Sequence, residues 1–403
     1  MKRIGNLERK YVLDVLDSQF KTSKGAEYMT RFENAFKEKF KSKFAISHVN
    51  GTATMHSVLE AAGIGIGDEV IVPPLTMAAT SLAVLHANAI PVFADVDIET
   101  FNIDATSIER KITEKTKAII TVALYGLSPD MDPIISLAKK HNLLVIEDNA
   151  QAFLSYYKGD LVGTFGDAAS FSFQSSKHLS SGEGGVTTTN NENLAHGIRK
   201  VSGLGYKSIG AKNAKIKKND IQHPSFERHD YIGWNYRMSE LNCAVALAQI
   251  ERADELINQR KKIGKIFKDA VEGFEWFNPQ YVGDDYESSY WAFACRLETE
   301  HVSWDDFRRK FLNEGGDKYY GAWKLTYLEP LFKNRMFRQR KDIIRSDYKN
   351  GLCPNAEALQ PQIKQFKTNY MSIEEATKQA EILNSTLRFF NVYGPRQDPS
   401  SEY

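Results

Sequence analysis

Cysteine is scarce in this sequence. Among the 403 residues there are only three, Cys243, Cys295 and Cys353, which lie far apart and form no CxxC pair. An odd number of widely spaced cysteines argues against a disulfide framework and against a zinc site, and it suits a reducing compartment. We therefore expect no metal centre and a cytoplasmic location.

Long apolar runs are missing as well. No segment reaches the roughly 18 uninterrupted apolar residues that suggest a membrane-spanning helix. The N-terminal stretch, MKRIGNLERKYVLDVLDSQF, contains no apolar core of the kind found in signal peptides. From these absences we expect no membrane partner and no export signal.

Charge of one sign is not in excess. The chain has 52 Lys and Arg against 51 Asp and Glu, so its formal net charge is +1. Bulk electrostatic binding to nucleic acid or to an anionic membrane depends on a positive surplus. We expect partners that are small molecules or a second copy of the chain, and no nucleic acid.

What the sequence does contain is an alternation of β-rich and helical segments. Its length and its 42% apolar content are enough for two domains with sizeable cores. The expected strands are Phe44–Val49, Glu69–Val72, Pro91–Val96, Ala118–Leu124, Leu143–Glu147, Ala169–Phe173 and Gly185–Thr189. The expected helices among them are about Thr52–Ala62, Met77–Ala87 and Asp132–His141. This alternation predicts an α/β fold with a mostly parallel sheet and helices on both faces.

The segments on either side of this region have other patterns. The N-terminal segment is amphipathic and helical, with Phe32, Phe36 and Phe40 on one face. Residues 204–228 are rich in Gly and Lys, and a loop of that length in a compact domain is usually functional or disordered. A helix capped by Ser239 follows it.

A smaller C-terminal domain is expected beyond this helix. A second helical stretch, about Glu251–Phe274, leads into it, and a strand at Tyr290–Leu297 belongs to it. We place the division between a large domain of residues 1–255, which includes the N-terminal helices, and a small domain of residues 256–403.

The segment VIEDNAQA, residues 145–152, delivers two acids to the carboxyl end of an expected strand. In open α/β sheets, ligands bind at this edge. Of the two acids, Glu147 and Asp148, either can serve there as an ion-pair partner for a protonated heterocycle. The alternative is that Asp148 only caps a following helix.

The segment SFSFQSSKHLSSGEGG, residues 170–185, places Lys177 in a polar turn between two strands. Desolvation and nearby cations in such a turn lower the pKa of a lysine and make it a usable nucleophile toward a carbonyl. The alternative is an exposed surface lysine, which is what most lysines are.

The segment HVNGTATMHSVLEAAGIG, residues 48–65, runs from a strand through Gly51 and Thr52 into a helix. The unpaired backbone N–H groups and hydroxyls at such a junction form a phosphate site. The alternative is ordinary capping by Asn50 or Thr52.

Together, these segments resemble the DegT/StrS family of sugar aminotransferases. The phosphate turn, the strand-end acid and the lysine occur in that order, the lysine roughly thirty residues after the acid. The resemblance runs from about residue 25 to residue 260, with further matches at residues 353–370. The matching blocks are NGTATMHSVL, GDEVIVPPLTMAATSLAVLHANAIPVFADVD, VIEDNAQA, GTFGDAASFSFQSSKHLSSGEGG and GWNYRMSELNCAVALAQIER. It implies a fold type I enzyme that depends on pyridoxal-5'-phosphate (PLP), with a mixed, mostly parallel seven-stranded sheet and a smaller α+β domain.

The resemblance also implies roles for individual residues. Lys177 would hold the cofactor as a Schiff base and then shuttle a proton during catalysis. Asp148 would pair with the pyridine nitrogen and keep it protonated, which makes the ring an electron sink. Gln151 would hydrogen-bond the phenolic oxygen, and Ala150 would pack on one face of the ring.

The cofactor's phosphate is assigned in the same way. Gly51, Thr52 and Ser172 would hold it within one chain. Asn235, from the block GWNYRM, would reach the phosphate in the neighbouring subunit. This last contact implies a homodimer with shared active sites.

The sequence departs from the family at two places. Met77 stands where the family has an aromatic residue that stacks on the ring, and methionine can still cover a ring. The segment YYGAWKLTYLEP, residues 319–330, does not match the expected sugar-contacting segment, and its aromatic residues either line the pocket or pack in the core. In one branch of the family a histidine replaces the lysine; here Lys177 is present, and we expect the adjacent His178 to pack or hydrogen-bond.

The expected reaction moves an amino group from an amino acid, glutamate or glutamine, to a ketone. The expected acceptor is a nucleotide-linked keto-sugar in surface-glycan or antibiotic-sugar biosynthesis. The alternatives are a small phosphorylated ketone or a cyclitol ketone; a PLP-dependent sugar dehydratase and a catalytically dead regulator rank below these. The lysines of residues 207–218 either contact phosphates of an anionic acceptor or form a solvated face.

Overall fold

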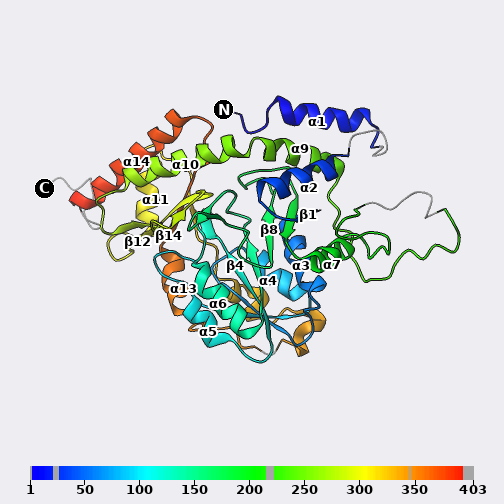
Figure 1. Cartoon of the computed structure of the whole chain (residues 1–403). Coiled ribbons are helices and arrows are strands. Elements are labelled where there is room, and N and C mark those ends of the chain that lie inside the picture. The colour runs from blue at the N-terminus through cyan, green and yellow to red at the C-terminus, as the bar shows by residue number, and fades with distance from the viewer. Residues whose placement is uncertain (1, 21–26, 215–221, 345, 394–403) are drawn as a thin grey trace.

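A seven-stranded sheet forms the centre of the molecule. The computed structural model describes residues 2–20, 27–214, 222–344 and 346–393, and within them this sheet has the strand order β1-β9-β8-β5-β4-β2-β3 (Figure 1). Its strands are β1 (Phe44–His48), β2 (Glu69–Val72), β3 (Ile90–Phe93), β4 (Thr116–Val122), β5 (Leu144–Asp148), β8 (Ala168–Ser172) and β9 (Gly185–Thr189). Neighbouring strands from β3 to β8 are parallel, whereas β9 runs antiparallel to both β8 and β1. The predicted α/β fold with a mixed, mostly parallel sheet is confirmed.

Helices cover both faces of this sheet. In β2, Val70 and Val72 belong to the core on one face and Ile71 to the core on the other, and all three are fully buried. The helices on the first face are α3 (Gly51–Ala61), α4 (Ala79–His86) and α7 (Glu192–Ser202). Those on the second are α5 (Ala105–Lys111) and α6 (Met131–His141). Burial on both faces explains why the sequences of these strands are runs of mostly apolar residues.

The N-terminal helices pack near the β1 edge. Both α1 (Asn6–Asp17) and α2 (Tyr28–Lys39) lie against α9 (Glu240–Glu251). The predicted aromatic face is buried: the rings of Phe36 and Phe171 lie 5.1 Å apart between centroids. The helical pattern is not continuous, however, because α1 ends at Asp17 and α2 starts at Tyr28.

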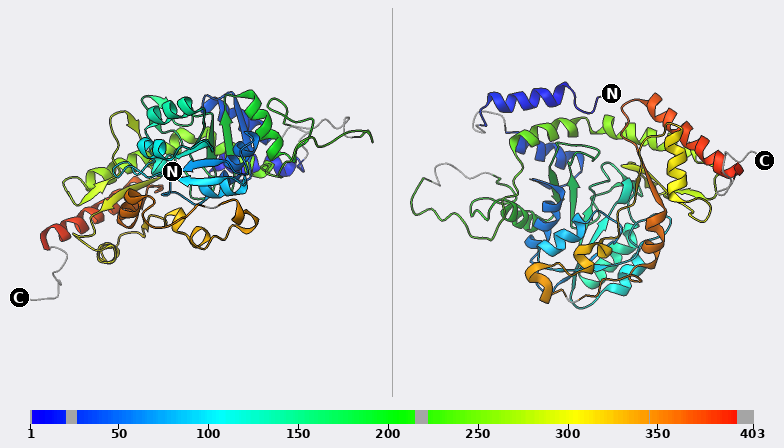
Figure 2. Two further views of the ribbon diagram at one scale, coloured as in Figure 1. Left: turned by 90° about the horizontal axis from the view of Figure 1, so that it is seen from below. Right: turned by 180° about the vertical axis from the view of Figure 1, so that it is seen from behind.

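A long helix, α10 (Ala253–Ala270), leads to a four-stranded antiparallel sheet with order β10-β12-β14-β13 (Figure 2). Its strands are β10 (Phe277–Pro279), β12 (Ala292–Leu297), β13 (Tyr320–Gly321) and β14 (Ile363–Lys367). Together with α10, the helices α11 (Trp304–Asn313) and α14 (Ile373–Tyr393) cover one face of this sheet.

The segment between β13 and β14 returns to the large sheet. The rings of Tyr327, Phe332 and Tyr348 surround Phe93 of β3, with centroid separations of 5.3, 5.6 and 5.6 Å. Residues beyond 256 therefore contribute to the core of the large sheet, and the division of the chain at residue 255 stays a prediction.

An arm projects from the molecule beside α7 (Figures 1 and 2). The arm comprises residues 203–214 and 222–236, and its base is held by the ion pair of Lys200 with Asp230 at 2.6 Å. Two of its lysines also pair with carboxylates: Lys207 with Glu227 and Lys212 with Glu192. The other lysines of the predicted anion-binding loop, Lys215, Lys217 and Lys218, lie outside the described residues.

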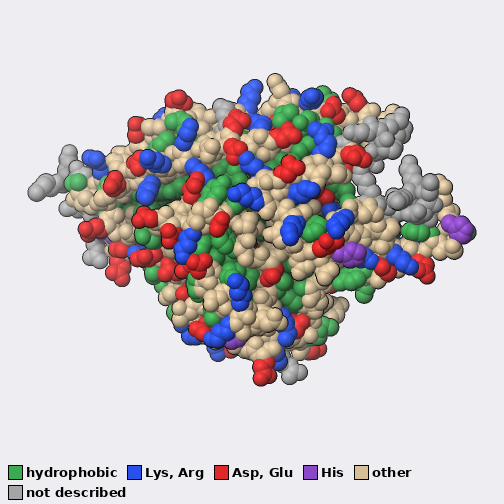
Figure 3. All heavy atoms as spheres, in the orientation of Figure 1, with side chains coloured by type: hydrophobic (Ala, Val, Ile, Leu, Met, Phe, Trp, Pro, Cys, Tyr) green, Lys and Arg blue, Asp and Glu red, His purple; other side chains and the backbone are tan. Residues whose placement is uncertain are grey.

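Acidic and basic side chains are interspersed over the face shown in Figure 3, in keeping with the near-zero net charge. Among the described residues, no helix is both long and apolar enough to cross a membrane. The same residues contain no group of three or more His, Cys, Asp or Glu side chains placed to hold a metal ion.

Several element boundaries differ from the predictions. The strand predicted to end at Val96 ends at Phe93, and the helix predicted from Met77 starts at Ala79. The strand predicted to reach Leu124 ends at Val122, because the chain turns sharply through Tyr125, whose φ is 59°. Residue preferences do not reveal such a turn, since a non-glycine residue with positive φ is held by its surroundings.

Candidate active site

Asp148 ends β5 in the middle of the large sheet, between β4 and β8. Its side chain is buried; Oδ2 accepts a hydrogen bond from Thr80 Oγ1 at 2.9 Å, and Oδ1 accepts one from Ala150 N at 3.1 Å. Burial raises the pKa of this carboxyl, while the two hydrogen bonds and the charge of Lys177 oppose that rise. Residues 149–155 contain turns and no helix, so the alternative that Asp148 caps a helix is wrong.

Glu147, the neighbouring acid, accepts hydrogen bonds from the backbone of a nearby turn. Its Oε2 accepts a hydrogen bond from Gly163 N at 2.7 Å, and its Oε1 accepts bonds from Phe165 N at 2.8 Å and Gly166 N at 2.7 Å. Successive residues of a strand point to opposite faces of the sheet. Glu147 therefore fixes the turn at residues 163–166, and Asp148 alone is available on the other face.

Lys177 lies in the turn after β8 and is half-buried, not a fully exposed surface lysine. Its Nζ is 5.0 Å from the centroid of the Trp291 ring. Burial lowers the pKa of this amine to about 8; the charge of Asp148 opposes the shift and that of Arg260 adds to it. At pH 7 roughly a tenth of the amine is therefore neutral, and hence nucleophilic, which is far more than for an ordinary lysine.

His178 lies behind this turn. It is buried, its Nε2 lies 3.0 Å from Ser289 O, and its ring centroid lies 5.9 Å from that of Phe153. Burial holds the pKa of the ring well below its usual value, so the imidazole is neutral. This environment is that of a packing and hydrogen-bonding residue.

The predicted phosphate turn lies against the end of β8. Gly51 is the first residue of α3, and Asn50 caps the helix by accepting a hydrogen bond from Ala53 N at 2.8 Å. A Cβ at Gly51 would lie only 2.9 Å from Ser172 Cβ, so no larger residue fits without a shift. Thr52 is half-buried beside it. Capping by Asn50 and an N-terminus open to an anion coexist here, because one cap satisfies only one of the first N–H groups.

Gln151 and Met77 are arranged around Asp148. Gln151 Oε1 accepts a hydrogen bond from Tyr125 N at 2.8 Å, so the group it offers to a ligand is its NH₂ donor. Met77 is 52% exposed and lies three residues before Thr80, which contacts Asp148. The structure thus brings both residues to the same edge of the sheet.

Asn235 is not part of this cluster. It is exposed on the arm, where its Oδ1 accepts a hydrogen bond from Arg237 Nε at 3.1 Å. Tyr236 O accepts a bond from Val49 N at 2.8 Å, which holds the base of the arm near the end of β1. Within the described chain no hydrogen bond joins Asn235 to Gly51, Ser172 or Lys177.

The sequence interpretation missed several residues that contact the cluster. Thr80 lies inside a matched block, but its spacing gave no sign of a contact with Asp148. Arg260 carried a usable signal: it interrupts the apolar face of a helix, with Leu256 and Ile257 before it and Ile263 after it. Among the aromatic residues of 319–330, Tyr319 is 3% exposed and packs in the core, so only part of this segment can line a pocket.

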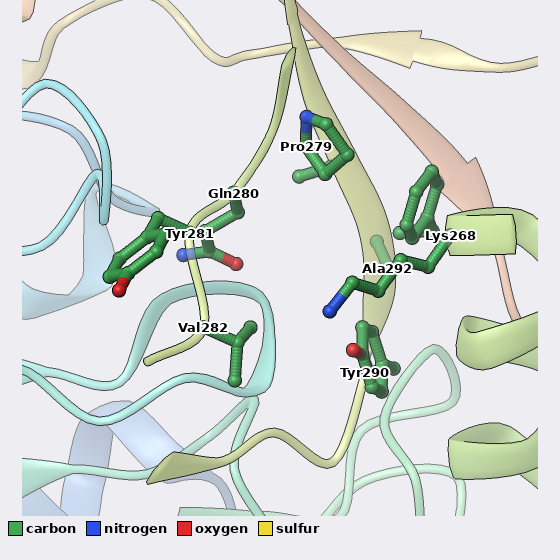
Figure 4. Close-up of a pocket in the computed structure, with 9 residues that line it drawn as sticks. Lys268, Pro279, Gln280, Tyr281, Val282, Tyr290 and Ala292 are labelled. Atoms are coloured by element: carbon green, nitrogen blue, oxygen red, sulfur yellow. The ribbon is translucent and has the colours of Figure 1, made fainter. Parts of the chain in front are cut away.

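A hollow of about 310 Å³ lies elsewhere, between α10 and the small sheet (Figure 4). Its lining includes Lys268, Gln280, Tyr281 and Tyr290. None of the predicted site residues lines it, so we do not count it as part of the active site.

Comparison with known proteins identifies the family. The DegT/DnrJ/EryC1/StrS aminotransferase family matches residues 2–376. The chain is 41% identical over 292 residues to GDP-perosamine synthase of Escherichia coli O157:H7, which is 72% of this chain and 75% of that protein. It is 33% identical over 344 residues to the putative L-glutamine:3-amino-2,3-dideoxy-scyllo-inosose aminotransferase of Streptoalloteichus tenebrarius, covering 82% and 78% of the two chains.

Solved structures agree with this assignment. An aminotransferase from Psychrobacter cryohalolentis superimposes with a TM-score of 0.85 at 30% identity, covering 96% of this chain and 98% of that chain. The predicted resemblance is thereby confirmed. The chain belongs to the DegT/DnrJ/EryC1/StrS aminotransferase family, and it is a PLP-dependent aminotransferase.

Proposed function

We propose that the protein moves an amino group from glutamate to the ketone of a nucleotide-linked keto-sugar in the cytoplasm, for surface-glycan or antibiotic-sugar biosynthesis. The observation that carries the chemistry is that the Lys177 amine, 5.0 Å from the centroid of the Trp291 ring, interacts electrostatically with the buried Asp148 carboxylate at the sheet edge. The similarity to GDP-perosamine synthase supports the choice of acceptor.

The residues at the sheet edge fit PLP. The missing side chain at Gly51 leaves the first N–H groups of α3 accessible, and with Thr52 and Ser172 they would hold a phosphate. Asp148 would hold the proton on the ring nitrogen, and Gln151 would donate its NH₂ group to the phenolic oxygen. PLP, when bound, supplies an electron sink for the carbon that loses or gains the amino group.

Lys177 would have two tasks. Its amine would hold the cofactor covalently, with loss of one water, and the lowered pKa favours the neutral form that this requires. When the donor amino acid takes that place, the freed Nζ would take the proton from the α carbon of the donor. Trp291 contacts one side of the amine and thereby limits where it can move.

We propose a homodimer with shared sites for the complete enzyme. The arm exposes apolar residues that a second chain would cover: Ile232 is 85% exposed and Trp234 45%. Asn235 directly follows Trp234 and is exposed in its own chain, which suits a role at the partner's phosphate site.

A screen of keto acceptors tests the proposal. The purified enzyme would receive ¹⁵N-labelled glutamate or glutamine together with keto-forms of nucleotide sugars, cyclitol ketones or small phosphorylated ketones. We expect mass spectrometry to find the label in a nucleotide sugar, and the Lys177→Ala variant to give no labelled product. The main alternative is a cyclitol ketone, which the similarity to the scyllo-inosose aminotransferase supports. Labelling of that ketone alone would overturn our choice of acceptor.

A further inference from the structure

The turn that carries Lys177 is held from several sides. We call residues 174–182 the lysine loop. Trp291 Nε1 donates a hydrogen bond to Ser176 O at 2.9 Å, and Ser180 N donates one to Gln249 Oε1 at 3.2 Å. Each contact comes from a segment far away in the sequence, so the loop is shaped by tertiary structure.

The main-chain carbonyl oxygen of Lys177 accepts hydrogen bonds from two guanidinium groups. Arg3 Nη2 donates to Lys177 O at 2.6 Å, and Arg260 Nη2 donates to the same oxygen at 3.4 Å. Arg260 Nη1 also donates to Trp291 O at 3.0 Å, so this arginine links the lysine to the residue whose ring covers its amine. In the described part of the chain, neither guanidinium forms an ion pair with a carboxylate.

Side chains of α9 and the residue after it hold the main chain of Arg3 in place near this carbonyl. Its own carbonyl oxygen accepts hydrogen bonds from Gln249 Nε2 at 2.9 Å and from Arg252 Nη1 at 3.2 Å. Glu8 of α1 is 1% exposed and accepts bonds from the same two side chains, at 2.7 and 2.8 Å. Gln249 therefore contacts both the N-terminal segment and the lysine loop, through Ser180.

We propose that Arg3 is a positioning residue for the reaction: it fixes the main chain of Lys177 and, with Arg260, places positive charge behind the amine. A charge-assisted hydrogen bond to a peptide oxygen is short and directional, so it limits the rotation of the peptide from which the lysine side chain extends. The N-terminal segment thereby becomes part of the active site, although it lies 174 positions before the lysine.

Charge adds a second, consistent effect. The charges that act on the Lys177 amine are those of Asp148 on β5, which raises its pKa, and Arg260 on α10, which lowers it. Burial, and secondly the charge of Arg3, lower the pKa of Arg260 to about 9. Arg3 acts on the amine through position: it binds the same carbonyl oxygen as Arg260 and so holds the amine close to the Arg260 charge.

This inference rests on the proposed role of Lys177, and the experiment keeps the two separable. In the apoenzyme, trace acetylation across a pH series, read by mass spectrometry of the Lys177 peptide, gives the midpoint of its reactivity. We expect a parent midpoint near the pKa of about 8. Arg3→Ala should raise it by about half a pH unit or more, because the released main chain lets the amine move away from the Arg260 charge and into solvent. Arg3→Lys, which keeps a charged donor, should stay closer to the parent.

The holoenzyme supplies a second measurement. In single-turnover reaction with glutamate, Arg3→Ala should lower the rate at saturation roughly 10-fold, because the amine is less well aimed, and leave the glutamate KM little changed. Lys2→Ala is the matched control, since it removes a neighbouring but exposed cation. It should change neither the midpoint nor the rate. Arg3→Met, which keeps most of the side-chain length but removes the donor and the charge, serves if Arg3→Ala does not fold.

Two results would overturn the inference. One is a midpoint and a rate in folded Arg3→Ala, or in Arg3→Met in its place, that equal those of the parent. The other is an equal shift in Lys2→Ala, which would make the effect one of overall charge. Borohydride reduction of the parent holoenzyme separates the two proposals: absence of a cofactor adduct on Lys177 contradicts the proposed function, whereas an adduct without an Arg3 effect contradicts only this inference.

Discussion

At the edge of the large sheet, Asp148 is 5% exposed and Gln151 is 4% exposed, whereas on the arm Ile232 is 85% exposed and Trp234 is 45% exposed. The sheet edge is organised within one chain: strand ends and the lysine loop are fixed by hydrogen bonds and core packing. The arm contacts its own chain through the ion pairs of Lys200 with Asp230 and Lys212 with Glu192, yet it still presents Ile232 and part of Trp234 to the outside. We therefore assign the cofactor chemistry to the sheet edge and propose that the arm, by meeting a second chain, completes the site.

Replacing Lys177 with alanine should cause the largest loss of activity among changes at the sheet edge. We expect transamination to fall by more than about 10³-fold, because the only amine proposed to bind the cofactor covalently and move the proton is gone. Borohydride reduction followed by peptide mass spectrometry should find no cofactor adduct on the protein. A reducible adduct on another lysine would contradict the assignment.

Replacing Asp148 with asparagine should cause the second largest loss of activity. An amide has no charge with which to hold the proton on the ring nitrogen, so we expect a loss of roughly 10²-fold or more in the rate with glutamate. Thr80 and Ala150 can still contact the amide, so PLP should remain bound. Absorbance of the bound cofactor and single-turnover kinetics check both points, and normal turnover would remove Asp148 from the mechanism.

The arm is tested by mixing two inactive chains. Lys177→Ala and Asn235→Ala each disable a different contribution to a shared site. In a mixed dimer, one site receives the intact lysine from one chain and the intact asparagine from the other. An equal mixture should recover about one quarter of the parent activity, since half of the dimers are mixed and each has one good site. No recovery, with exchange of subunits demonstrated by mass spectrometry, would contradict shared sites.

The smallest effects are expected among the lysines of the arm. Lys207→Ala should change kcat/KM for the acceptor by less than about twofold, because its pairing with Glu227 is exposed and surface ion pairs contribute little. The triple variant of Lys215, Lys217 and Lys218 is the comparison. If these residues contact an anionic acceptor, their replacement by alanine raises the acceptor KM and spares the glutamate half-reaction. Equal effects on both half-reactions would make the loop a solvated surface.

Apolar periodicity was enough to predict the sheet, and motif order marked the strand-end acid, the lysine turn and the phosphate turn, whereas the cofactor roles came from the family resemblance and stay proposals. Asp148 could be placed because the strand before it is apolar and parallel strands end at one edge of the sheet. The contacts of Arg3, Arg260 and Trp291 could not be predicted, since each joins residues that are far apart in sequence and none forms a motif. The role of Asn235 came from the family resemblance alone, and it stays a proposal.

The sequence by itself determined the fold class and the family, and it supplied the reactive groups that we propose, because apolar alternation, turn residues and spaced motifs are local properties of the chain. Only the tertiary structure decided which of two adjacent acids is available: strand pleating turns Glu147 toward backbone N–H groups at residues 163–166 and Asp148 toward Lys177. The lowered pKa of Lys177 is likewise a tertiary property. It depends on burial and on the charges of Asp148 and Arg260, which the fold brings together from other parts of the chain.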